Sequence, residues 1–396
     1  MSDGAEVDPA ELHPLARLPE DWEVVLARAG EPRFRARQVF RWLHAQGQHS
    51  PTEMTNLPRP LRQQLTSETL DVPAAVGSVH RAEDGTRKLV LELDGARVEC
   101  VLIPMTRPAG EAKDADLAAL PDDDDDVADD APRSQRVTLC LSTQYGCAMG
   151  CVFCASGRAG LVRGLRAEEI VAQVQIARRH LEPGEHLRNL VFMGMGEPLH
   201  HYDETARALR VLTHADGLDL SPRRITVSTV GLVPGIRRLG RDFSGKIGLA
   251  VSLHAPNDAV RAQIVPMNQR YSVADILAAL AEYPLPRRRR ITIEYTLIAG
   301  VNDRPEHAEE LARVLRRLRV KVNLIPMNAV AGAGLEGSPP ERVAEFRERV
   351  ARAGLSCFVR VRRGDDVSAA CGQLAYSGPL VDPARLRGVG RASREP

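Results

Sequence analysis

From residue 137 onward, short runs of β-branched and other apolar residues alternate with stretches in which apolar residues recur every three to four positions. The strand-like runs are VTLCL (137–141), NLVFM (189–193), ITVST (225–229), IGLAVSL (247–253), ITIEYTL (291–297), VKVNLI (320–325) and CFVRV (357–361). A helical period lies between the first two runs, with Ile170, Val171, Val174 and Ala177 on one face. Repeated strand and helix units predict an α/β fold whose parallel sheet curls into a full or partial (β/α) barrel. Its functional groups should gather at the carboxyl ends of the strands.

The N-terminal part of the chain has a different pattern. Residues 34–65 predict short helices broken by prolines, in which apolar and arginine side chains interleave. The apolar face consists of Phe34, Val39, Phe40, Trp42 and Leu43, and the arginines between them are Arg35, Arg37 and Arg41. The run RKLVLELDGARVECVLIP (87–104) predicts a pair of strands that turns at DGA. We therefore expect a small, mostly helical accessory domain before the core.

These patterns divide the chain into four parts. They are a helical accessory domain over 1–95, with a linking hairpin that starts near 87; a linking strand and acidic insertion over 96–135; the core barrel over 136–365; and a C-terminal segment over 366–396. A chain of 396 residues is long enough for one large core and an accessory domain, because single cores stop growing near ~250–300 residues.

The net charge of +1 hides an uneven distribution. Residues 111–130, EAKDADLAALPDDDDDVADD, hold ten acids and one base, so this run carries −9 and the rest of the chain +10. Such a run repels itself and has little apolar surface to bury, so we expect a solvated, disordered insertion. The basic remainder includes PRFRARQVFRW (32–42), RRRR (287–290) and RVLRRLR (313–319). These runs fit either solvated helix faces or a nucleic-acid partner.

The first twenty residues, MSDGAEVDPAELHPLARLPE, are acidic and polar and lack the basic-then-apolar order of a secretory signal. No segment approaches the ~18 uninterrupted apolar residues of a membrane span. Seven cysteines, an odd number without a framework spacing, favour a reducing compartment in which thiols serve metal binding or catalysis. We therefore expect a cytoplasmic protein with no membrane partner.

Polar or glycine-bearing motifs follow five of the predicted strands. They are CAMGCVFC (147–154), GMGEP (194–198), STVG (228–231), SLHAPN (252–257) and PMN (326–328). Because the carboxyl ends of parallel strands meet at one edge of a sheet or barrel, these motifs should converge there. Their convergence would be a stronger sign of a functional site than any one of the motifs.

The motif CAMGCVFC places Cys147, Cys151 and Cys154 close together. A structural zinc site uses four tetrahedral ligands, whereas a [4Fe–4S] cluster held by three thiolates leaves one iron open to an exogenous ligand. Three ligands in one loop favour the cluster. Zinc remains an alternative, because Cys140, seven residues before Cys147, could supply a fourth ligand, and buried thiols without a metal are another.

The spacing C-x3-C-x2-C after the first barrel strand, with Phe153 inside it, resembles the radical S-adenosylmethionine superfamily. The resemblance implies that S-adenosylmethionine chelates the open iron through its amino and carboxylate groups and is cleaved there reductively to a 5′-deoxyadenosyl radical. In GMGEP, Gly196 would let the backbone approach this ligand, and Glu197 would accept from its ammonium group. Considered by itself, His254 would be interpreted as a histidine that stabilises the fold. Its position at the edge where the motifs meet favours a contact with the ligand instead. Further contacts are expected from Ser228, Ser252, Leu253, His254 and Asn328.

Further segments of the chain resemble one particular family within this superfamily. The segments TLCLSTQYGCAMGCVFC, MGMGEPL, SLHAPND and RGDDVSAACGQL, with the helical N-terminal region, are similar to the RNA adenine-C2 methyltransferases of the RlmN type from about residue 12 to about residue 380. The resemblance implies methylation of carbon 2 of an adenine in the peptidyl-transferase region of 23S rRNA and of another beside the tRNA anticodon. Carbon 2 lies between two ring nitrogens and is too electron-poor to displace a methyl group as a nucleophile, which explains the use of a radical.

The family mechanism implies roles for three residues outside the cysteine loop. One S-adenosylmethionine would methylate Cys371, and the radical from a second would remove a hydrogen from that methyl group before it adds to the base. Glu99 would accept the C2 proton, and Cys140 would release the product through a transient Cys140–Cys371 disulfide. Without the resemblance, Glu99 would be a strand-surface carboxylate. We expect Cys100 and Cys357 to be buried structural thiols.

The resemblance also implies 23S rRNA and tRNA as partners and an electron donor such as flavodoxin or ferredoxin, and we expect a monomer. The acidic insertion departs from the family pattern, in which this link is short, and it could alter RNA access. Two alternative functions remain. One is methylation of C8 of the same rRNA adenine, as in resistance enzymes of similar sequence, and the other is a non-catalytic zinc-containing RNA-binding protein.

Overall fold

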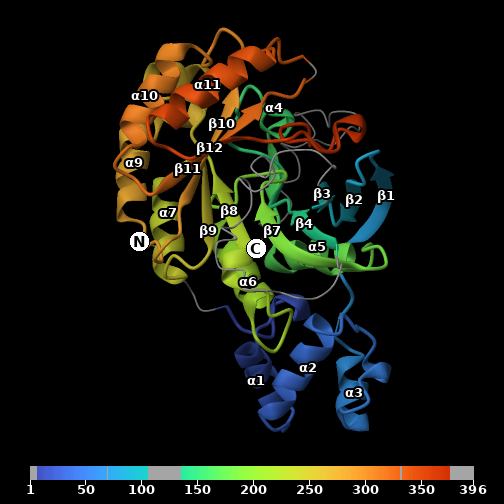
Figure 1. The fold of residues 1–396 in the computed structure, drawn as a ribbon. Coiled ribbons are helices and arrows are strands. Elements are labelled where there is room, and N and C mark those ends of the chain that lie inside the picture. The colour runs from blue at the N-terminus through green and yellow to red at the C-terminus, as the bar shows by residue number, and fades with distance from the viewer. Residues whose placement is uncertain (1–6, 69, 106–134, 331, 375–396) are drawn as a thin grey trace, which may run out of the picture.

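The computed structural model describes residues 7–68, 70–105, 135–330 and 332–374. In this part of the chain, seven parallel strands form the larger part of one ten-stranded sheet (Figure 1). In sheet order they are β4 Gln135–Cys140, β7 Glu185–Phe192, β8 Ile225–Thr229, β9 Gly248–Ser252, β10 Ile291–Leu297, β11 Val320–Pro326 and β12 Cys357–Val359. Each coincides with one of the runs predicted as strands, so the predicted parallel sheet is confirmed.

Three antiparallel strands extend the sheet beyond β4. They are β1 Ala75–Arg81, β2 Arg87–Leu93 and β3 Ala96–Pro104, and β3 pairs with β4. The predicted hairpin is confirmed, because β2 and β3 are joined at Asp94 and Gly95, where Gly95 has a φ of +62° as this tight turn requires. Strand β1 was not predicted, since its side chains are mostly exposed and show no apolar alternation. With β1 and β12 at the two edges of this described sheet, the fold is a partial barrel.

The sheet begins earlier in the chain than the predicted core. The boundary expected near residue 95 falls in the β2–β3 turn, inside the sheet, and the division of the chain into four parts stays a prediction. The acidic run 111–130 lies outside the described residues, between β3 and β4 in the chain.

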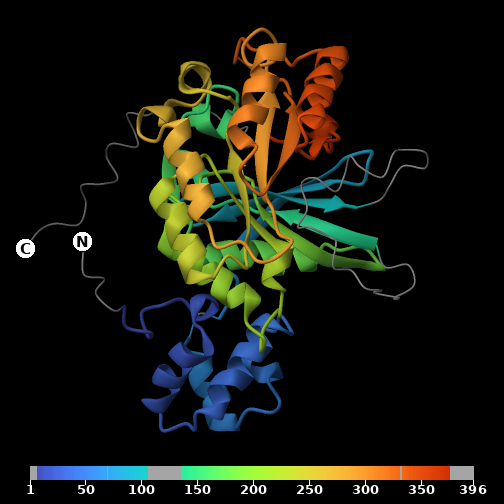
Figure 2. The ribbon, with the colours of Figure 1, turned by 60° about the vertical axis from the view of Figure 1, so that its left-hand side comes forward.

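Helices cover the outer face of the curved sheet (Figures 1 and 2). They are α5 Ala167–Arg178, α6 Tyr202–Thr213, α7 Val233–Asp242, α8 Asp258–Ile264, α9 Val273–Glu282, α10 Pro305–Leu315 and α11 Pro340–Arg352. Shorter elements are α4 Ala155–Ala159, η3 Pro222–Arg224, η4 Pro266–Gln269, η5 Asp365–Val367 and a two-stranded ribbon of β5 Gln144–Gly146 and β6 Leu161–Gly164. The predicted helical period over Ile170 to Ala177 lies in α5, where these residues are buried.

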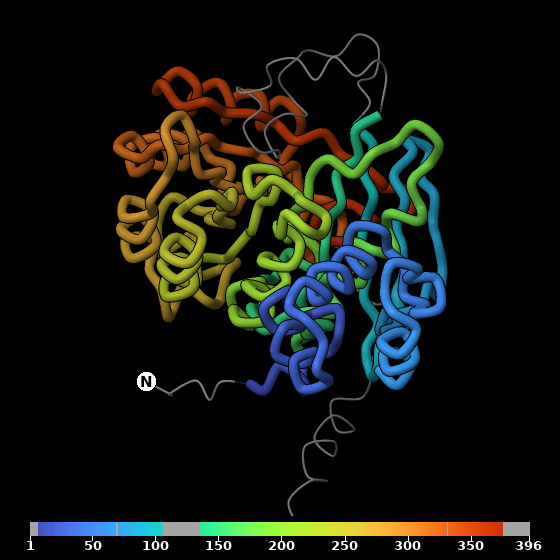
Figure 3. Tube along the Cα trace, turned by 90° about the horizontal axis from the view of Figure 1, so that it is seen from below, coloured from blue at the N-terminus to red at the C-terminus, as the bar shows by residue number. Residues whose placement is uncertain are grey.

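The N-terminal helices form a bundle that docks on α5 and α6 (Figures 1 and 3). They are η1 Pro14–Ala16, α1 Pro19–Ala27, α2 Phe34–His44, η2 Pro51–Glu53 and α3 Arg59–Leu65. Gln175 of α5 donates from Nε2 to the Leu43 carbonyl at 3.1 Å, and Arg178 donates to the His44 carbonyl at 3.1 Å. Hydrogen bonds to the last carbonyls of α2 thus fix this bundle to the core.

The predicted apolar face of α2 is confirmed at Val39, Phe40 and Leu43, whereas Trp42 is only partly buried and Phe34 is exposed. The buried residues of this helix are Ala36, Val39, Phe40, Leu43 and His44. Phe34 lies two positions before Ala36, roughly 200° around the helix, so it falls off this stripe. It is 55% exposed, and the guanidinium of Arg35 lies over its ring at 4.6 Å.

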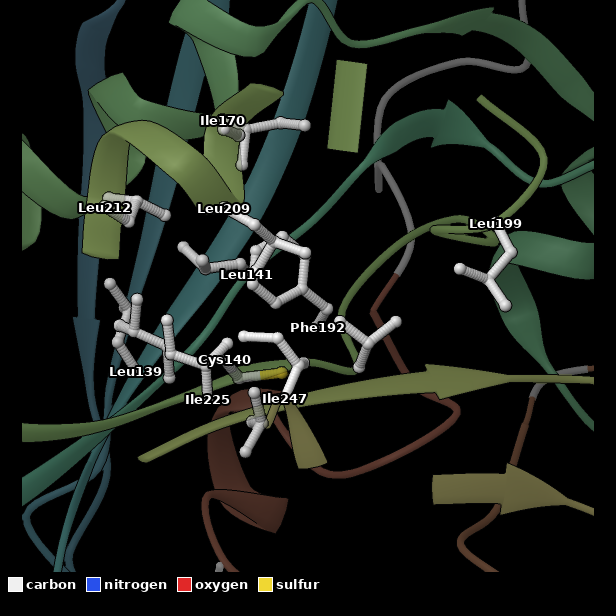
Figure 4. Close-up of a cluster of buried hydrophobic side chains, with 14 of the residues drawn as sticks. Leu139, Cys140, Leu141, Ile170, Phe192, Leu199, Leu209, Leu212, Ile225 and Ile247 are labelled. Atoms are coloured by element: carbon white, nitrogen blue, oxygen red, sulfur yellow. The ribbon is translucent and has the colours of Figure 1, made fainter. Parts of the chain in front are cut away.

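The apolar core reaches the strand ends that carry the predicted site. Figure 4 shows Cys140 with its sulfur among Phe192, Ile225 and Ile247, all of which are buried. Packing at this depth fixes the carboxyl ends of β4 and β7, at Cys140 and Phe192, from which two loops of the site begin. Among helices in the described ranges, none is long and apolar enough to cross a membrane.

Candidate active site

Loops at the carboxyl ends of the parallel strands line one cavity. The predicted residues that line it are Cys147, Cys151, Cys154, Gly196, Glu197, Ser228, Ser252, His254, Asn328 and Cys371. Leu253 is fully buried in the core, and neither Glu99 nor Cys140 lines this cavity. The fold therefore brings residues that are more than two hundred positions apart in the chain to one cavity.

The three cysteines of the 147–154 loop fit an iron–sulfur cluster better than a zinc ion. Burial raises the pKa of Cys147 to about 12 and also raises the pKa of Cys151 and Cys154, so without a metal these are neutral thiols. Among the described side chains, no three Cys, His, Asp or Glu converge closely enough to bind one metal ion. A cluster of four irons gives each thiolate its own iron, so its ligands surround a cavity instead. Cys140, the candidate fourth zinc ligand, lines a different cavity.

Glu197 is held by the backbone of two loops. Its Oε1 accepts from the N–H of Leu199 at 3.0 Å, and its Oε2 accepts from the N–H of Val230 at 2.8 Å. Burial raises the pKa of Glu197 to about 7, although these hydrogen bonds oppose the shift. A ligand ammonium group in the cavity would favour the ionised carboxylate. The carboxyl group is thus suited to the predicted contact.

Gln144 of β5 supports this turn. The sequence analysis did not identify it, because a single glutamine in a sequence does not indicate a functional site. Its Oε1 accepts from the N–H of Glu197 at 2.9 Å. Gly196 has a φ of +104°, and a Cβ there would lie 2.6 Å from Cβ of Gln144. The close approach of these two backbones therefore requires the glycine that the motif supplies.

His254 combines a structural role with a position on the cavity wall. Its Nδ1 accepts from the N–H of Thr296 at 3.0 Å, so the ring proton is on Nε2. Burial lowers the pKa of His254 to about 3, which keeps the ring neutral. Phe153 of the cysteine loop packs edge-on against it, with ring centroids 4.7 Å apart. The histidine thus links the cysteine loop to β10 and offers an Nε2–H to a ligand.

Arg261 of α8 ties two of the cavity loops together and was also missed. Its Nη2 donates to the Val230 carbonyl at 2.5 Å, and its Nε donates to the Leu253 carbonyl at 3.0 Å. Its Nη1 donates to Oδ1 of Asn268 at 3.2 Å. The side chain is fully buried, and burial lowers the pKa of Arg261 to about 10. This guanidinium therefore fixes the loops after β8 and β9 relative to each other.

Cys371 lines a second cavity as well, which it shares with Cys140. Asn328 donates from Nδ2 to the Cys371 carbonyl at 2.9 Å, and the N–H of Ala155 donates to the Gly372 carbonyl at 2.8 Å. The segment that carries Cys371 is thus bonded to the residue that follows Cys154. Cys371 lies in the wall of both cavities.

Cys140 ends β4 directly opposite Val101 of β3. Burial and, to a smaller extent, the neighbouring Cys371 together raise the pKa of Cys140 to about 12, and Arg360 opposes this shift. All seven cysteines of the chain lie in the described ranges and are free thiols, so the expected Cys140–Cys371 disulfide is not present in this form.

Glu99 is not the strand-surface carboxylate that its sequence context alone suggests. Its side chain is buried, and Oε1 lies 3.1 Å from Nζ of Lys88 on β2. The hydroxyl of Ser142 donates to the Glu99 carbonyl at 2.6 Å. The sequence analysis did not identify Lys88, because a single lysine in a strand usually has a solvated side chain.

The two cysteines without an expected role differ in exposure. Cys100 is fully buried, as expected, and burial raises its pKa well above the usual range. The expected burial of Cys357 is wrong, because this residue begins the edge strand β12 and is only partly buried.

Two of the predicted basic runs, in α2 and at 287–290, do not line the cavity. The RRRR run at 287–290 immediately precedes β10, so it is at the amino ends of the strands, opposite the cavity. In α2, the side chains of Arg37 and Arg41 are 68% and 59% exposed, and both approach Asp216, at 3.7 and 2.7 Å. Arg37 and Arg41 of α2 therefore stay accessible beside Asp216, and the 287–290 run lies at the end of the strands opposite the cavity.

Comparisons with known proteins agree with this architecture. Residues 141–315 match the family model of the radical SAM superfamily, and residues 19–70 match that of the ribosomal RNA large subunit methyltransferase N-terminal domain. The dual-specificity RNA methyltransferase RlmN of Sorangium cellulosum is 58% identical over 385 residues, which cover 95% of this chain and 99% of that protein. The protein of the same name from Anaeromyxobacter dehalogenans is 45% identical over 379 residues, 94% of each chain.

A solved structure extends the likeness to three dimensions. The crystal structure of a radical SAM methyltransferase from Sphaerobacter thermophilus matches with a TM-score of 0.80 at 41% identity, and the match covers 92% of this chain and 99% of that chain. The resemblance inferred from the motifs is confirmed. Sequence identity over almost the full length of both chains shows that this protein belongs to the RlmN family of dual-specificity RNA methyltransferases, within the radical SAM superfamily.

Proposed function

We propose that this protein methylates carbon 2 of a specific adenine in 23S rRNA and in tRNA, by way of a methylated Cys371 and with two S-adenosylmethionine molecules per turnover. The observation that carries this proposal is the position of Cys371 between two cavities. One cavity also holds the three cluster cysteines, and the other holds Cys140. A single thiol can therefore take up the methyl group on one side and be released from its adduct on the other.

The cavity residues suit the two cofactors. Cys147, Cys151 and Cys154 would hold the [4Fe–4S] cluster, and S-adenosylmethionine would bind to Gly196, Glu197, Ser228, Ser252, Leu253, His254 and Asn328. When bound, the cluster supplies the electron that cleaves S-adenosylmethionine and so provides the radical. In support, Oδ1 of Asn328 is buried without a hydrogen-bond partner among the described residues, which leaves an acceptor for a ligand donor. The neutral His254 ring adds a donor, and Glu197 adds a carboxylate for an ammonium group.

Cys371 would form and break the covalent bonds to the RNA. Its thiolate displaces S-adenosylhomocysteine from the first S-adenosylmethionine and becomes a methyl thioether. Removal of one hydrogen atom from that methyl group leaves a methylene radical, which adds to the electron-poor C2 of the adenine. The adduct would then return one electron to the oxidised external electron carrier, such as flavodoxin or ferredoxin, and lose the C2 proton, for which Glu99 is the proposed acceptor.

Cys140 would release the methylated base. Its thiolate attacks the sulfur of Cys371, the S–S bond forms and the S–C bond breaks. The electron pair of the broken bond goes to the methylene carbon, which takes up a proton and becomes the product methyl group. Two electrons from an external reductant then restore both thiols. Burial disfavours the Cys140 thiolate, and Arg360 in the shared cavity favours it, so Arg360 would support this attack.

The RNA must present an unstacked base to the cavity, because C2 lies inside the stack of a helix. The exposed arginines of α2 would hold phosphates of the folded RNA. The matched N-terminal domain of rRNA methyltransferases spans this helix, which supports that assignment. An electron donor such as flavodoxin or ferredoxin remains a prediction.

Mass spectrometry of nucleosides tests the proposal. Anaerobically purified protein is incubated with rRNA or tRNA, reductant and S-adenosylmethionine, and Cys371→Ala serves as the inactive control. We expect 2-methyladenosine from the unaltered protein and none from the variant. The product 8-methyladenosine would replace the C2 assignment by the C8 activity. Absence of both, with one zinc and no sulfide in the protein, would overturn the radical mechanism.

A further inference from the structure

Lys88 and Glu99 form a buried ion pair within the sheet. Lys88 of β2 lies opposite Val101 of β3, and Glu99 lies opposite Val90, so the two charged side chains are diagonal neighbours on one face. Nζ and Oε1 are 3.1 Å apart, and the side chains are 9% and 4% exposed. Ion pairs at the surface contribute little to the stability of a protein. At this burial, however, the loss of one partner is costly, because the remaining charge stays in a site that water solvates poorly.

This ion pair shares its sheet face with Cys140. Val101 lies opposite both Lys88 of β2 and Cys140 of β4, and residues directly opposite in a sheet point to the same side. Glu99 is two residues before Val101 and therefore points to that side too. The strand register alone places the proposed proton acceptor, its lysine and the proposed resolving thiol on one face of three neighbouring strands.

The same ammonium group contacts the segment that carries Cys371. Nζ of Lys88 lies 3.4 Å from the carbonyl oxygen of Ser368, three residues before Cys371. The N–H of Gly364 donates to Oδ2 of Asp84, in the turn before β2, at 3.0 Å and holds the start of this segment against the same hairpin. The lysine thus joins the carboxylate to the segment of the methyl-carrying cysteine.

We propose that Lys88 is a positioning residue for proton transfer, which holds the buried Glu99 carboxylate ionised and oriented beside the Cys371 segment. This inference rests on the function proposed above. A carboxyl group in a buried site favours its neutral form unless a cation faces it, and a neutral acid cannot accept the C2 proton. The titratable groups near Glu99 include Lys88 from β2 and Cys100 beside it in β3; Cys140 of β4 shares its sheet face, and Arg360 is a cation near Cys140.

The test uses the full-length, cluster-loaded protein with its RNA substrate in a single turnover. Denaturing gels measure how much RNA stays covalently bound to Cys371 at pH values from about 6.5 to 9. In Lys88→Met we expect release of the RNA at about pH 7 to slow by roughly 10- to 100-fold, as the loss of a general base would cause. Release should recover as the pH rises, because higher pH ionises the carboxyl group without the lysine. Lys88→Arg should restore release near neutral pH, and Lys246→Met, which removes an exposed lysine, should change nothing.

The outcomes separate this inference from the proposed function. Normal release from Lys88→Met at every pH, while Glu99→Gln still retains the RNA, would overturn the role of Lys88. If the unaltered protein forms neither adduct nor methylated adenosine, the proposed function itself fails. If Lys88→Met does not fold, the double variant Lys88→Met/Glu99→Gln is tested in its place, because it leaves neither member of the ion pair charged. Its release should match that of Glu99→Gln alone, and a further slowing would show that Lys88 does not act through Glu99.

Discussion

Replacement of Arg261 by methionine tests whether one buried guanidinium holds the ligand-binding loops. The side chain donates to the carbonyls of Val230 and Leu253 and to the amide oxygen of Asn268, over 2.5, 3.0 and 3.2 Å. Methionine fills similar space but leaves these three buried acceptors without that donor. At about 2 kcal/mol for each unsatisfied acceptor, the loss is roughly 6 kcal/mol.

Part of this loss is offset, because a buried charge is itself costly. The desolvation that lowers the pKa of Arg261 from 12.5 to about 10 corresponds to roughly 3 kcal/mol, which the neutral methionine avoids. The expected net loss of unfolding free energy is therefore about 3 kcal/mol. The affinity for S-adenosylmethionine should fall as well, since Val230 and Leu253 begin the loops after β8 and β9, two strands whose last residues include Ser228 and Ser252.

Urea-induced unfolding measures the first effect, and equilibrium binding of S-adenosylmethionine to the cluster-loaded protein measures the second. Arg270→Met is the matched control, because this arginine is exposed and lies nine residues further along; its stability should change by less than about 0.5 kcal/mol. A loss below about 1 kcal/mol in Arg261→Met, or unchanged ligand affinity despite a large loss, would refute the reasoning.

Three further predictions concern other parts of the molecule. Cys140→Ala should leave RNA covalently bound to Cys371, as seen by mass spectrometry of the protein; free RNA as the only outcome would contradict the resolving role. Cys151→Ala should lose iron and acid-labile sulfide together, whereas Cys357→Ala should keep both. His44→Gln should make stability less sensitive to acid, as urea unfolding at pH 7 and 5 can measure. Burial lowers the pKa of His44 from 6.5 to about 3, so below pH 6.5 only the unfolded chain binds this proton, and stability falls by up to about 1.4 kcal/mol per pH unit. An equal pH dependence in the variant and the unaltered protein would exclude this histidine as the cause.

The strand pattern and the cysteine spacing were readable in the sequence because both are local. Apart from β12, which has three residues, each parallel strand is a run of five to eight residues, and burial on both faces favours apolar residues along it. Strand β1 was missed for the opposite reason, since its exposed side chains carry no such signal. Phe34 was misplaced because an apolar residue at a helix start need not lie on the buried stripe.

The sequence by itself determined the alternation of strands and helices, the loop of three cysteines and the edge of the sheet at which the motifs meet, since these follow from hydrophobic period and from the parallel connection of strands. Only the tertiary structure decided which distant side chains complete the site. Lys88 reaches Ser368 across 280 residues of chain, and Arg261 bonds carbonyls of two separate loops. The sequence does not distinguish a solvated lysine or arginine from a buried one, because the role of the side chain depends on partners that only folding brings within hydrogen-bond distance.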